Sequence, residues 1–125
     1  MRSIKYRAWD IKKNCFVGKN WHLNFSDGNI IFDDRSEYRI AGSFEIMQFT
    51  GNMDQNLKEI YEGDLLILNG DEKAMFEVFY HDDEARFKCC RVHYLGNRCG
   101  GYVPEMTSKN LTIIGNIYEN KELLK

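Results

Sequence analysis

The sequence predicts an all-β protein that forms a single domain over residues 1–125. Apolar and polar residues alternate with a two-residue period along much of the chain, and Gly-, Asn- and Asp-containing turns separate the alternating segments. Hardly any segment shows the period of a helix, and Pro104 is the only proline, so no Pro-rich linker divides the chain. Roughly seven to nine short strands of this kind are typical of a barrel or a sandwich.

The first part of the chain predicts an N-terminal β-hairpin region. Ile4 to Trp9 alternate as a half-buried strand does, and the polar segment 10–14 would turn the chain back. Asp27-Gly28 suits a tight hairpin turn, because glycine tolerates the positive φ that such a turn requires. The strands expected in this part are residues 4–9, 15–17, 21–25, 30–32 and 38–50.

The second part contains the most apolar segment, Leu65 to Leu68, which predicts a strand buried on both faces. Before it, we expect a polar connector over residues 51–58 with a short helical turn across Leu57, Ile60 and Tyr61. After it, Asn69-Gly70 is a strong hairpin signal.

Further strands are expected over residues 74–80, 86–94 and 111–117, with a bulge or break at Cys89-Cys90, where the alternation slips. We predict a surface loop over residues 96–110 and a short helix or tail over residues 119–124. The residues expected in the core are Leu65, Ile67, Phe76, Val78, Ile113 and Ile117.

The small net charge of −2 conceals an uneven distribution. Residues 1–26 carry six Lys or Arg against one Asp, residues 27–84 carry four against fifteen Asp or Glu, and residues 85–125 carry seven against three. Two interpretations stay open: the basic flanks neutralise the acidic middle in the fold, or separate patches serve a nucleic acid or a basic partner. The small net charge argues against strong sequence-independent binding to DNA, which depends on neutralising phosphates.

We expect a cytoplasmic protein. The N-terminal residues 1–10 lack the apolar segment of a signal peptide, and the apolar run at Leu65 to Leu68 is far too short to span a membrane. The four cysteines are then expected to stay reduced.

Three sequence blocks resemble the YopX family of phage and prophage proteins. They are Lys5–Asp10, Met47–Gly51 followed by Lys58–Asp64, and Ile114–Asn120, and they occur in the order typical of the family. The resemblance implies a phage or prophage origin, a mostly β fold and a small cytosolic product, without implying an activity. Family members commonly have Asn-Gly where this chain has Asn56-Leu57. Because leucine avoids positive φ, we expect a different turn here, with Leu57 packed inward.

The order of Glu62 to Leu66, Asn69-Gly70 and Phe76 to Tyr80 is also similar to the strand–turn–strand core of SH3-like barrels. We therefore predict a small SH3-like barrel with an additional N-terminal β-hairpin region and a short C-terminal helix or tail. The pattern serves the fold prediction only, since unrelated functions share such barrels.

Signals for metal or catalytic chemistry are weak. Cys89 and Cys90 are adjacent, so in a strand their sulfur atoms point to opposite faces and cannot readily join His93 and Cys99 around one zinc ion. Asp64 with Asp71-Glu72-Lys73 matches the minimal pattern of a metal-dependent nuclease, but the second group is expected in a hairpin turn. His81-Asp82-Asp83 lacks the further His partners of metal phosphohydrolases. We expect no cofactor and favour a non-enzymatic protein.

The favoured function is that of a phage accessory protein that binds a host or phage protein. The alternative is nucleic-acid binding through the basic flanks. The N-terminal flank combines charge with an aromatic ring in Arg2, Lys5, Arg7, Trp9, Lys12 and Lys13, and Arg86, Lys88 and Arg91 would extend the surface. The third, a metal-dependent nuclease or phosphohydrolase, has little support. Self-association through an edge strand is left open. The candidate binding residues are Lys5, Arg7, Trp9, Asp10, Tyr61, Glu62 and Asp64.

Overall fold

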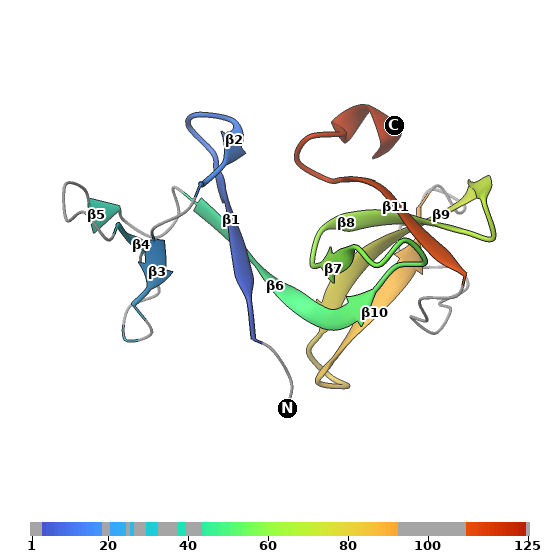
Figure 1. Ribbon diagram of the computed structural model, residues 1–125, viewed down its shortest axis with the longest axis horizontal. Helices are drawn as coiled ribbons and strands as arrows, with labels where there is room; N and C mark the ends of the chain where they lie inside the picture. The colour runs from blue at the N-terminus through green and yellow to red at the C-terminus, as the bar shows by residue number, and fades with distance from the viewer. Residues whose placement is uncertain are drawn as a thin grey trace. The chain divides into compact units, whose positions relative to one another are not determined.

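The computed structural model describes residues 4–18, 21–24, 26, 30–32, 38–39, 44–92 and 110–124. These residues are mostly in β-strands, and the one helix among them is the short 3₁₀ helix η1 (Lys121–Leu124) (Figure 1). The prediction of an all-β fold with a short C-terminal helix is therefore confirmed. No helix in the described ranges is long and apolar enough to span a membrane.

The strands form three antiparallel sheets, with orders β2-β1-β6-β7, β10-β9-β8-β11 and β3-β4-β5. The strands are β1 (Tyr6–Asp10), β2 (Cys15–Phe16), β3 (Trp21–Leu23), β4 (Ile30–Phe32), β5 (Tyr38–Arg39), β6 (Phe44–Met53), β7 (Glu59–Tyr61), β8 (Asp64–Leu68), β9 (Asp71–His81), β10 (Arg86–Arg91) and β11 (Leu111–Asn116). The chain divides into two compact units, one of Arg7–Ile46 and one of Met1–Tyr6 with Met47–Lys125. The expectation of a single domain stays a prediction.

The Arg7–Ile46 unit has its own small apolar cluster. Ala8, Ile30 and Phe44 are buried in it, and Val17, Trp21, Leu23 and Ile46 pack against them. Strands β1 and β2 form the predicted hairpin, whose turn is held by the Asp10 carboxylate: its Oδ1 accepts the backbone N–H groups of Lys12 and Lys13, both at 3.0 Å. The predicted Asp27-Gly28 turn lies outside the described residues.

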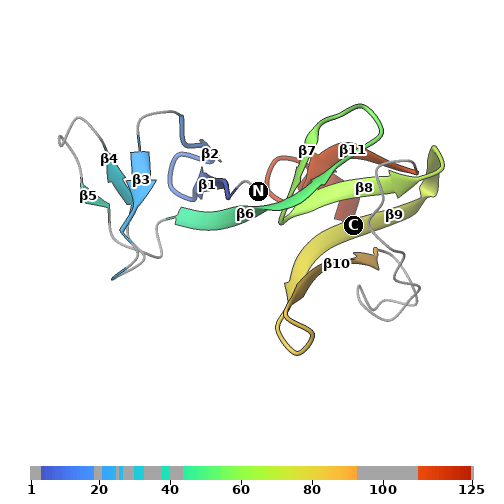
Figure 2. The same cartoon turned by 60° about the horizontal axis from the view of Figure 1, so that its bottom comes forward.

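In the other unit, β8 is the central strand and is buried on both faces. Leu66 packs with Phe76, Val78 and Cys89 in one cluster, whereas Leu65 and Ile67 belong to another on the opposite face. Alternate residues of a strand point to opposite faces, so a continuous apolar run fits this position. The sheet β10-β9-β8-β11 is curled, and the β9–β10 hairpin bends away from β8 (Figure 2).

The core and hairpin predictions for this unit are confirmed. Leu65, Ile67, Phe76 and Val78 are buried, and Ile113 and Ile117 are partly buried against the clusters. Asn69 and Gly70 have φ values of 54° and 71°, as a tight hairpin turn with two left-handed residues requires. The SH3-like topology stays a prediction, and the loop predicted over residues 96–110 lies outside the described residues except for Asn110.

The bulge predicted at Cys89-Cys90 is wrong. The pairing of β10 with β9 runs without a register shift from Arg86 to Arg91. The alternation of the sequence slips because the strand is buried on both faces here, with Cys89 and Cys90 both enclosed. Burial raises the pKa of the Cys89 thiol to about 12, so this thiol is an unreactive core group.

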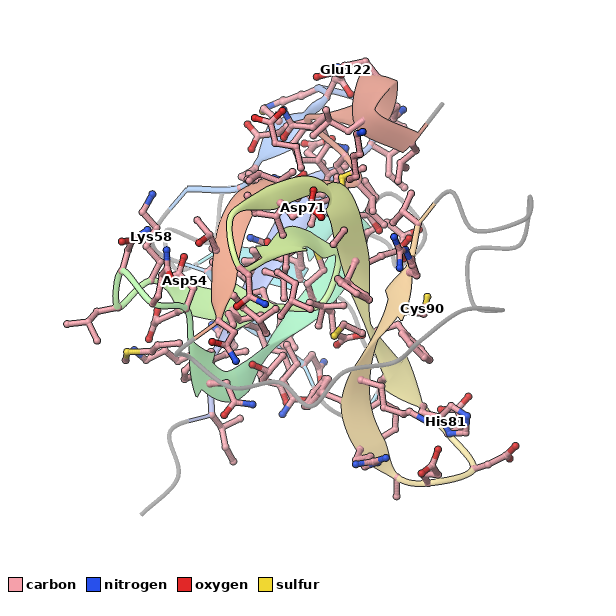
Figure 3. All side chains as sticks on the ribbon, turned by 90° about the vertical axis from the view of Figure 1, so that its right-hand side faces the viewer. Asp54, Lys58, Asp71, His81, Cys90 and Glu122 are labelled. Atoms are coloured by element: carbon pink, nitrogen blue, oxygen red, sulfur yellow. The ribbon has the colours of Figure 1, made fainter. Side chains whose placement is uncertain are left out.

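The connector after β6 is organised by the buried carboxylate of Asp54. Its Oδ1 accepts the N–H groups of Asn56 at 2.8 Å and Lys58 at 2.9 Å, and its Oδ2 accepts the N–H of Ile113 at 3.0 Å. The N–H of Gln55 donates to the carbonyl of Leu111 at 2.9 Å. Asp54 thus fixes the turn of the connector and joins it to β11; Figure 3 labels it beside Lys58.

This arrangement overturns the prediction for Leu57. No helical turn forms, because Ile60 and Tyr61 lie in strand β7, and Leu57 has a φ of 63° and is 77% exposed instead of being packed inward. A left-handed conformation costs an L-residue about 1–2 kcal/mol. The hydrogen bonds to the Asp54 carboxylate on both sides of Leu57 offset that cost.

A turn at Gly63 is hydrogen-bonded to three other parts of this unit. The N–H of Glu62 donates to the carbonyl of Gln48 in β6, the N–H of Gly63 donates to Val78 in β9, and the carbonyl of Gly63 accepts the N–H of Ile117 after β11. Gly63 has a φ of 84°, and a Cβ there would lie 3.3 Å from the Met47 sulfur atom. The backbone conformation and the tight contact with Met47 therefore both favour glycine here.

We predict that Asp54→Asn destabilises the protein by about 2 kcal/mol, because the amide NH₂ would face a backbone N–H in place of an accepting oxygen. Burial alone would raise the pKa of Asp54, but the N–H groups of Ile113, Lys58 and Asn56 outweigh it and lower the pKa. The stabilisation is therefore fully present above a pH of about 4, the unfolded pKa, and is lost as the pH falls through the lower folded value.

Urea unfolding of both proteins across pH checks this, with Asp71→Asn as the control. Asp71 accepts a similar turn hydrogen bond, from Lys73 N–H at 2.9 Å, but is exposed, so its loss should stay within about 0.5 kcal/mol. Equal losses for the two variants, or a difference that grows on acidification below pH 4, would contradict the role given to Asp54.

We predict that Gly63→Ala destabilises the protein more than Gly70→Ala. Both glycines have positive φ, so both variants carry backbone strain of about 1 kcal/mol. Only at Gly63 would the methyl group crowd neighbours, at 3.3 Å from Met47, and this overpacking adds about 1 kcal/mol or more. Thermal unfolding of the two variants measures the difference. Equal melting temperatures would show that the turn has room to adapt.

Candidate functional site

An open groove of about 1010 Å³ lies in the unit that contains β7 to β11. It runs between β6 on one side and the β9–β10 hairpin on the other, with Glu62 from the Gly63 turn also lining it. This volume is at the upper end of the range typical of small-molecule pockets. The lining residues are Gln48, Thr50, Asn52, Glu62, Phe79, Tyr80, Asp82, Ala85, Arg86 and Phe87.

The β6 wall of the groove is polar. Gln48, Thr50 and Asn52 line this side of the groove, and between them β6 is irregular: its pairing with β7 shifts register between Phe49 and Met53, and Gly51 has a φ of 90°. The wall is held internally: Glu62 Oε1 accepts the N–H of Gln48 at 3.0 Å, and the Thr50 hydroxyl donates to the carbonyl of Ile60 at 2.8 Å. The result is a fixed strand surface with two amide side chains along it.

The opposite wall is formed by an aromatic pair. Tyr80 in β9 and Phe87 in β10 are direct cross-strand partners, and their rings meet edge to face with centroids 5.2 Å apart. Tyr80 is 43% exposed, and both residues lie outside the two apolar clusters described for this unit. The pair therefore presents apolar surface that the described core does not use, and such aromatic surface is enriched at binding sites.

The turn of the β9–β10 hairpin carries a local charge network. Glu84 pairs with Arg86 at 3.1 Å and with Lys88, and the hydrogen bond from Lys88 is the main reason that the pKa of Glu84 is lowered. His81 Nδ1 accepts the N–H of Glu84 at 3.1 Å and so fixes the turn; His81 is labelled at this end of the hairpin in Figure 3. Asp82 of this turn is one of the residues that line the groove.

The basic and aromatic residues predicted near the N-terminus have partners within the chain. Lys5 pairs with Glu59, which raises the pKa of Lys5, and its ammonium lies 5.6 Å from the centre of the Phe49 ring. The guanidinium of Arg7 lies 4.9 Å from the centre of the Phe16 ring. Trp9 meets Phe16 edge to face and is only 4% exposed, so its ring is not accessible for stacking on a base. Arg2 lies outside the described residues.

The predicted acidic residues have structural contacts, and one of them lines the groove. Asp10 holds the β1–β2 turn, and buried Asp64 accepts the N–H of Tyr61 at 2.8 Å. Tyr61 packs against Phe49 with ring centroids 5.6 Å apart. Of the seven predicted residues only Glu62 belongs to the groove. Two features of the sequence could have indicated the other residues of the groove. They are the polar residues at alternate positions 48, 50 and 52, and the aromatic residues on both sides of the turn after β9.

The carboxylates of the nuclease pattern are not brought together. Asp64 begins β8, whereas Asp71 pairs with Leu68 at its other end, so about 13 Å of strand separates them. Within the described ranges, no group of three or more His, Cys, Asp or Glu side chains is placed to hold a metal ion. His93 and Cys99 lie outside those ranges.

Comparison with known proteins identifies structural relatives. The protein EF1440 from Enterococcus faecalis has a crystal structure that matches with a TM-score of 0.66 and 27% identity, covering 100% of both chains. The yopX protein from Bacillus subtilis matches with a TM-score of 0.56 and 20% identity, covering 100% of this chain and 98% of its own. None of the curated proteins compared with the chain matches it.

Two of the three blocks that carry the family resemblance, the central and the C-terminal one, meet in the structure at the Gly63 turn. Met47, Ile117 and Tyr118 all lie within 3.6 Å of the position that a Cβ of Gly63 would take. Gly115 is confined in the same way, because its Cβ would lie 2.3 Å from Oδ1 of Asn120. Residues of these blocks thus make close contacts that help to fix the fold. The YopX protein family model matches residues 5–125, nearly the whole chain, and the chain belongs to the YopX family.

Proposed function

We propose that this chain is a non-enzymatic accessory protein of a phage or prophage that acts in the cytoplasm of the host by binding a host or phage protein. The observation that carries the proposal is the groove between β6 and the β9–β10 hairpin, where exposed Tyr80 packs against the partly buried ring of Phe87 on one wall. Aromatic side chains at the centre of a partly apolar surface contribute most to protein–protein affinity. The polar β6 wall supplies donors and acceptors that would orient a partner.

The charges favour a protein partner over a nucleic acid. Glu62 and Asp82 line the groove, and carboxylates repel phosphates. Arg86 and Lys88, which were expected to extend a basic surface, share the single carboxylate of Glu84. Lys5 pairs with Glu59. A cation that already pairs with a carboxylate gains less binding free energy from a phosphate than an unpaired cation does. These residues therefore provide weak support for the nucleic-acid alternative.

The site also offers little for catalysis. The groove contains carboxylates and amides, but its lining includes no His, Cys or Ser that could act as a nucleophile beside a base. Asp64, the first residue of the nuclease pattern, is buried and occupied by the N–H of Tyr61. A binding role requires no further chemistry from these residues.

The proposal predicts that tagged protein captures a specific protein from host lysate, with or without phage infection, and that the capture survives nuclease treatment. Tyr80→Ser should reduce the recovery about tenfold, because an aromatic hot-spot residue contributes roughly 1–2 kcal/mol or more. Ile114→Ser is the matched control: Ile114 is also an exposed apolar residue on a strand, at 37%, but it does not line the groove. Mass spectrometry of the recovered proteins gives the measurement.

Recovery that disappears with nuclease would favour the nucleic-acid alternative, and Lys5→Glu with Arg7→Glu should then abolish it. Equal loss in Tyr80→Ser and Ile114→Ser would show that the groove is not the binding surface. Capture of untagged copies of the same chain would identify self-association as the function of the surface.

A further inference from the structure

The turn that joins β9 to β10 is closed by a histidine. His81, the last residue of β9, accepts the backbone N–H of Glu84 on its Nδ1 atom at 3.1 Å. The N–H of Ala85 donates to the carbonyl of Asp82 at a longer distance, 3.3 Å. Ala85 has a φ of 52°, in the left-handed region that L-residues avoid. The conformation of this strained turn therefore depends on the contact that His81 makes.

The contact with Glu84 requires a neutral imidazole. A ring nitrogen accepts a hydrogen bond only when it carries no proton, so neutral His81 holds its proton on Nε2. Protonation places a second hydrogen on Nδ1, where it faces the N–H of Glu84. Two donors cannot hydrogen-bond to each other, so the charged ring loses this contact. Histidine is the side chain that gains and loses charge between about pH 5 and 8.

An acceptor for the charged ring lies close to the same nitrogen. Oε2 of the Glu84 carboxylate is 3.6 Å from Nδ1 of His81. Lys88 pairs with this oxygen, and Arg86 donates to Oε1 at 3.1 Å. The hydrogen bond from Lys88 is the main reason that the pKa of Glu84 is lowered, so the carboxylate is ionised throughout the range in which a histidine changes charge. A charged His81 therefore competes with Lys88 for Oε2.

The turn and the facing part of β10 place several further charges around this histidine. Arg86 is the direct cross-strand partner of His81, and Lys88 follows two residues later. The charged side chains of the turn and of this part of β10 are Asp82, Asp83, Glu84, Arg86 and Lys88. They carry three negative charges against two positive ones, so a proton on His81 changes the net charge of this end of the hairpin from −1 to zero.

The same end of the hairpin belongs to the groove. Asp82, Ala85 and Arg86 line it, and the next cross-strand pair along the hairpin is Tyr80 with Phe87. A change in the turn therefore changes the shape and the charge of one wall of the groove. Figure 3 labels His81 at this end of the hairpin.

We propose that His81 is a pH-sensitive switch in the wall of the groove. On protonation its ring releases the backbone N–H of Glu84 and takes Oε2 of that side chain from Lys88. The turn that carries Asp82 and Ala85 then opens. The switch is a property of the hairpin alone, whereas its effect on the binding of a partner rests on the proposed function.

The test is ¹⁵N NMR of the labelled full-length protein over a series of pH values from about 8 to about 5. At the upper end, a scalar coupling across the N–H···N hydrogen bond should join the amide nitrogen of Glu84 to Nδ1 of His81. The coupling should disappear on acidification, and the amide resonances of Glu84 and Ala85 should shift with the midpoint of the His81 ring. Glu84→Gln, which keeps the backbone N–H but removes the carboxylate, should move this midpoint to lower pH.

His81→Asn is the matched variant. Oδ1 of an asparagine is separated from the backbone by the same number of bonds as Nδ1 of a histidine, so it accepts the N–H of Glu84 without taking up a proton. The Glu84 amide should then stay constant across the series. The internal control is the N–H of Lys73, which donates to the Asp71 carboxylate at 2.9 Å in another exposed turn and should not follow the ring.

Three outcomes would overturn the inference. They are the absence of the coupling at the upper end of the series, a Glu84 amide that does not respond when the ring takes up its proton, and an equal response in His81→Asn. The NMR experiment uses the protein alone, so its failure is distinguishable from failure of the proposed function, which the capture from lysate measures. A partner that is captured and lost in Tyr80→Ser would keep the binding role even if the turn did not respond to pH.

Discussion

The backbone turn at Gly63 is the constraint on which the candidate site depends. One peptide unit of this turn bonds to Gln48 in β6, and the next bonds to Val78 in β9, so the two strands that become the walls of the groove are fixed at a common base. Gly63 has a positive φ, and a Cβ at this position would make a tight contact with the Met47 side chain. At the other end of the β6–β7 hairpin, the Asp54 carboxylate ties the connector to β11. Because both ends of the β6–β7 hairpin are fixed by these contacts, the fold itself sets the position of the groove walls.

The fold could be predicted because local sequence patterns determine most of it. The apolar run at β8, the Asn69-Gly70 turn and the alternation along β9 each report a strand or turn directly. The errors occurred where tertiary contacts overruled local preference. Leu57 adopts positive φ because the Asp54 carboxylate binds the N–H groups around it, and that carboxylate is itself tied to a strand more than fifty residues away.

The candidate site was much less predictable. Its walls come from β6 and from the β9–β10 hairpin, and no single segment shows that they face one groove. The predicted residues lie in the blocks that resemble the family, and the carboxylates of Asp10 and Asp64 in these blocks accept backbone hydrogen bonds that hold the fold. Glu62 belongs to both, since it hydrogen-bonds to β6 and lines the groove. Thus most of the residues by which the family is recognised do not line the groove.

The most direct measurement of the central claim, that the groove is a protein-binding site, is site-specific photocrosslinking in host cells. Benzoylphenylalanine would replace either Tyr80 in the groove or Ile114 on β11 outside it. If the groove binds a protein, position 80 should give one discrete crosslinked protein and position 114 none. Crosslinks of the same pattern from both positions, or crosslinks to a partner from position 114 alone, would contradict it.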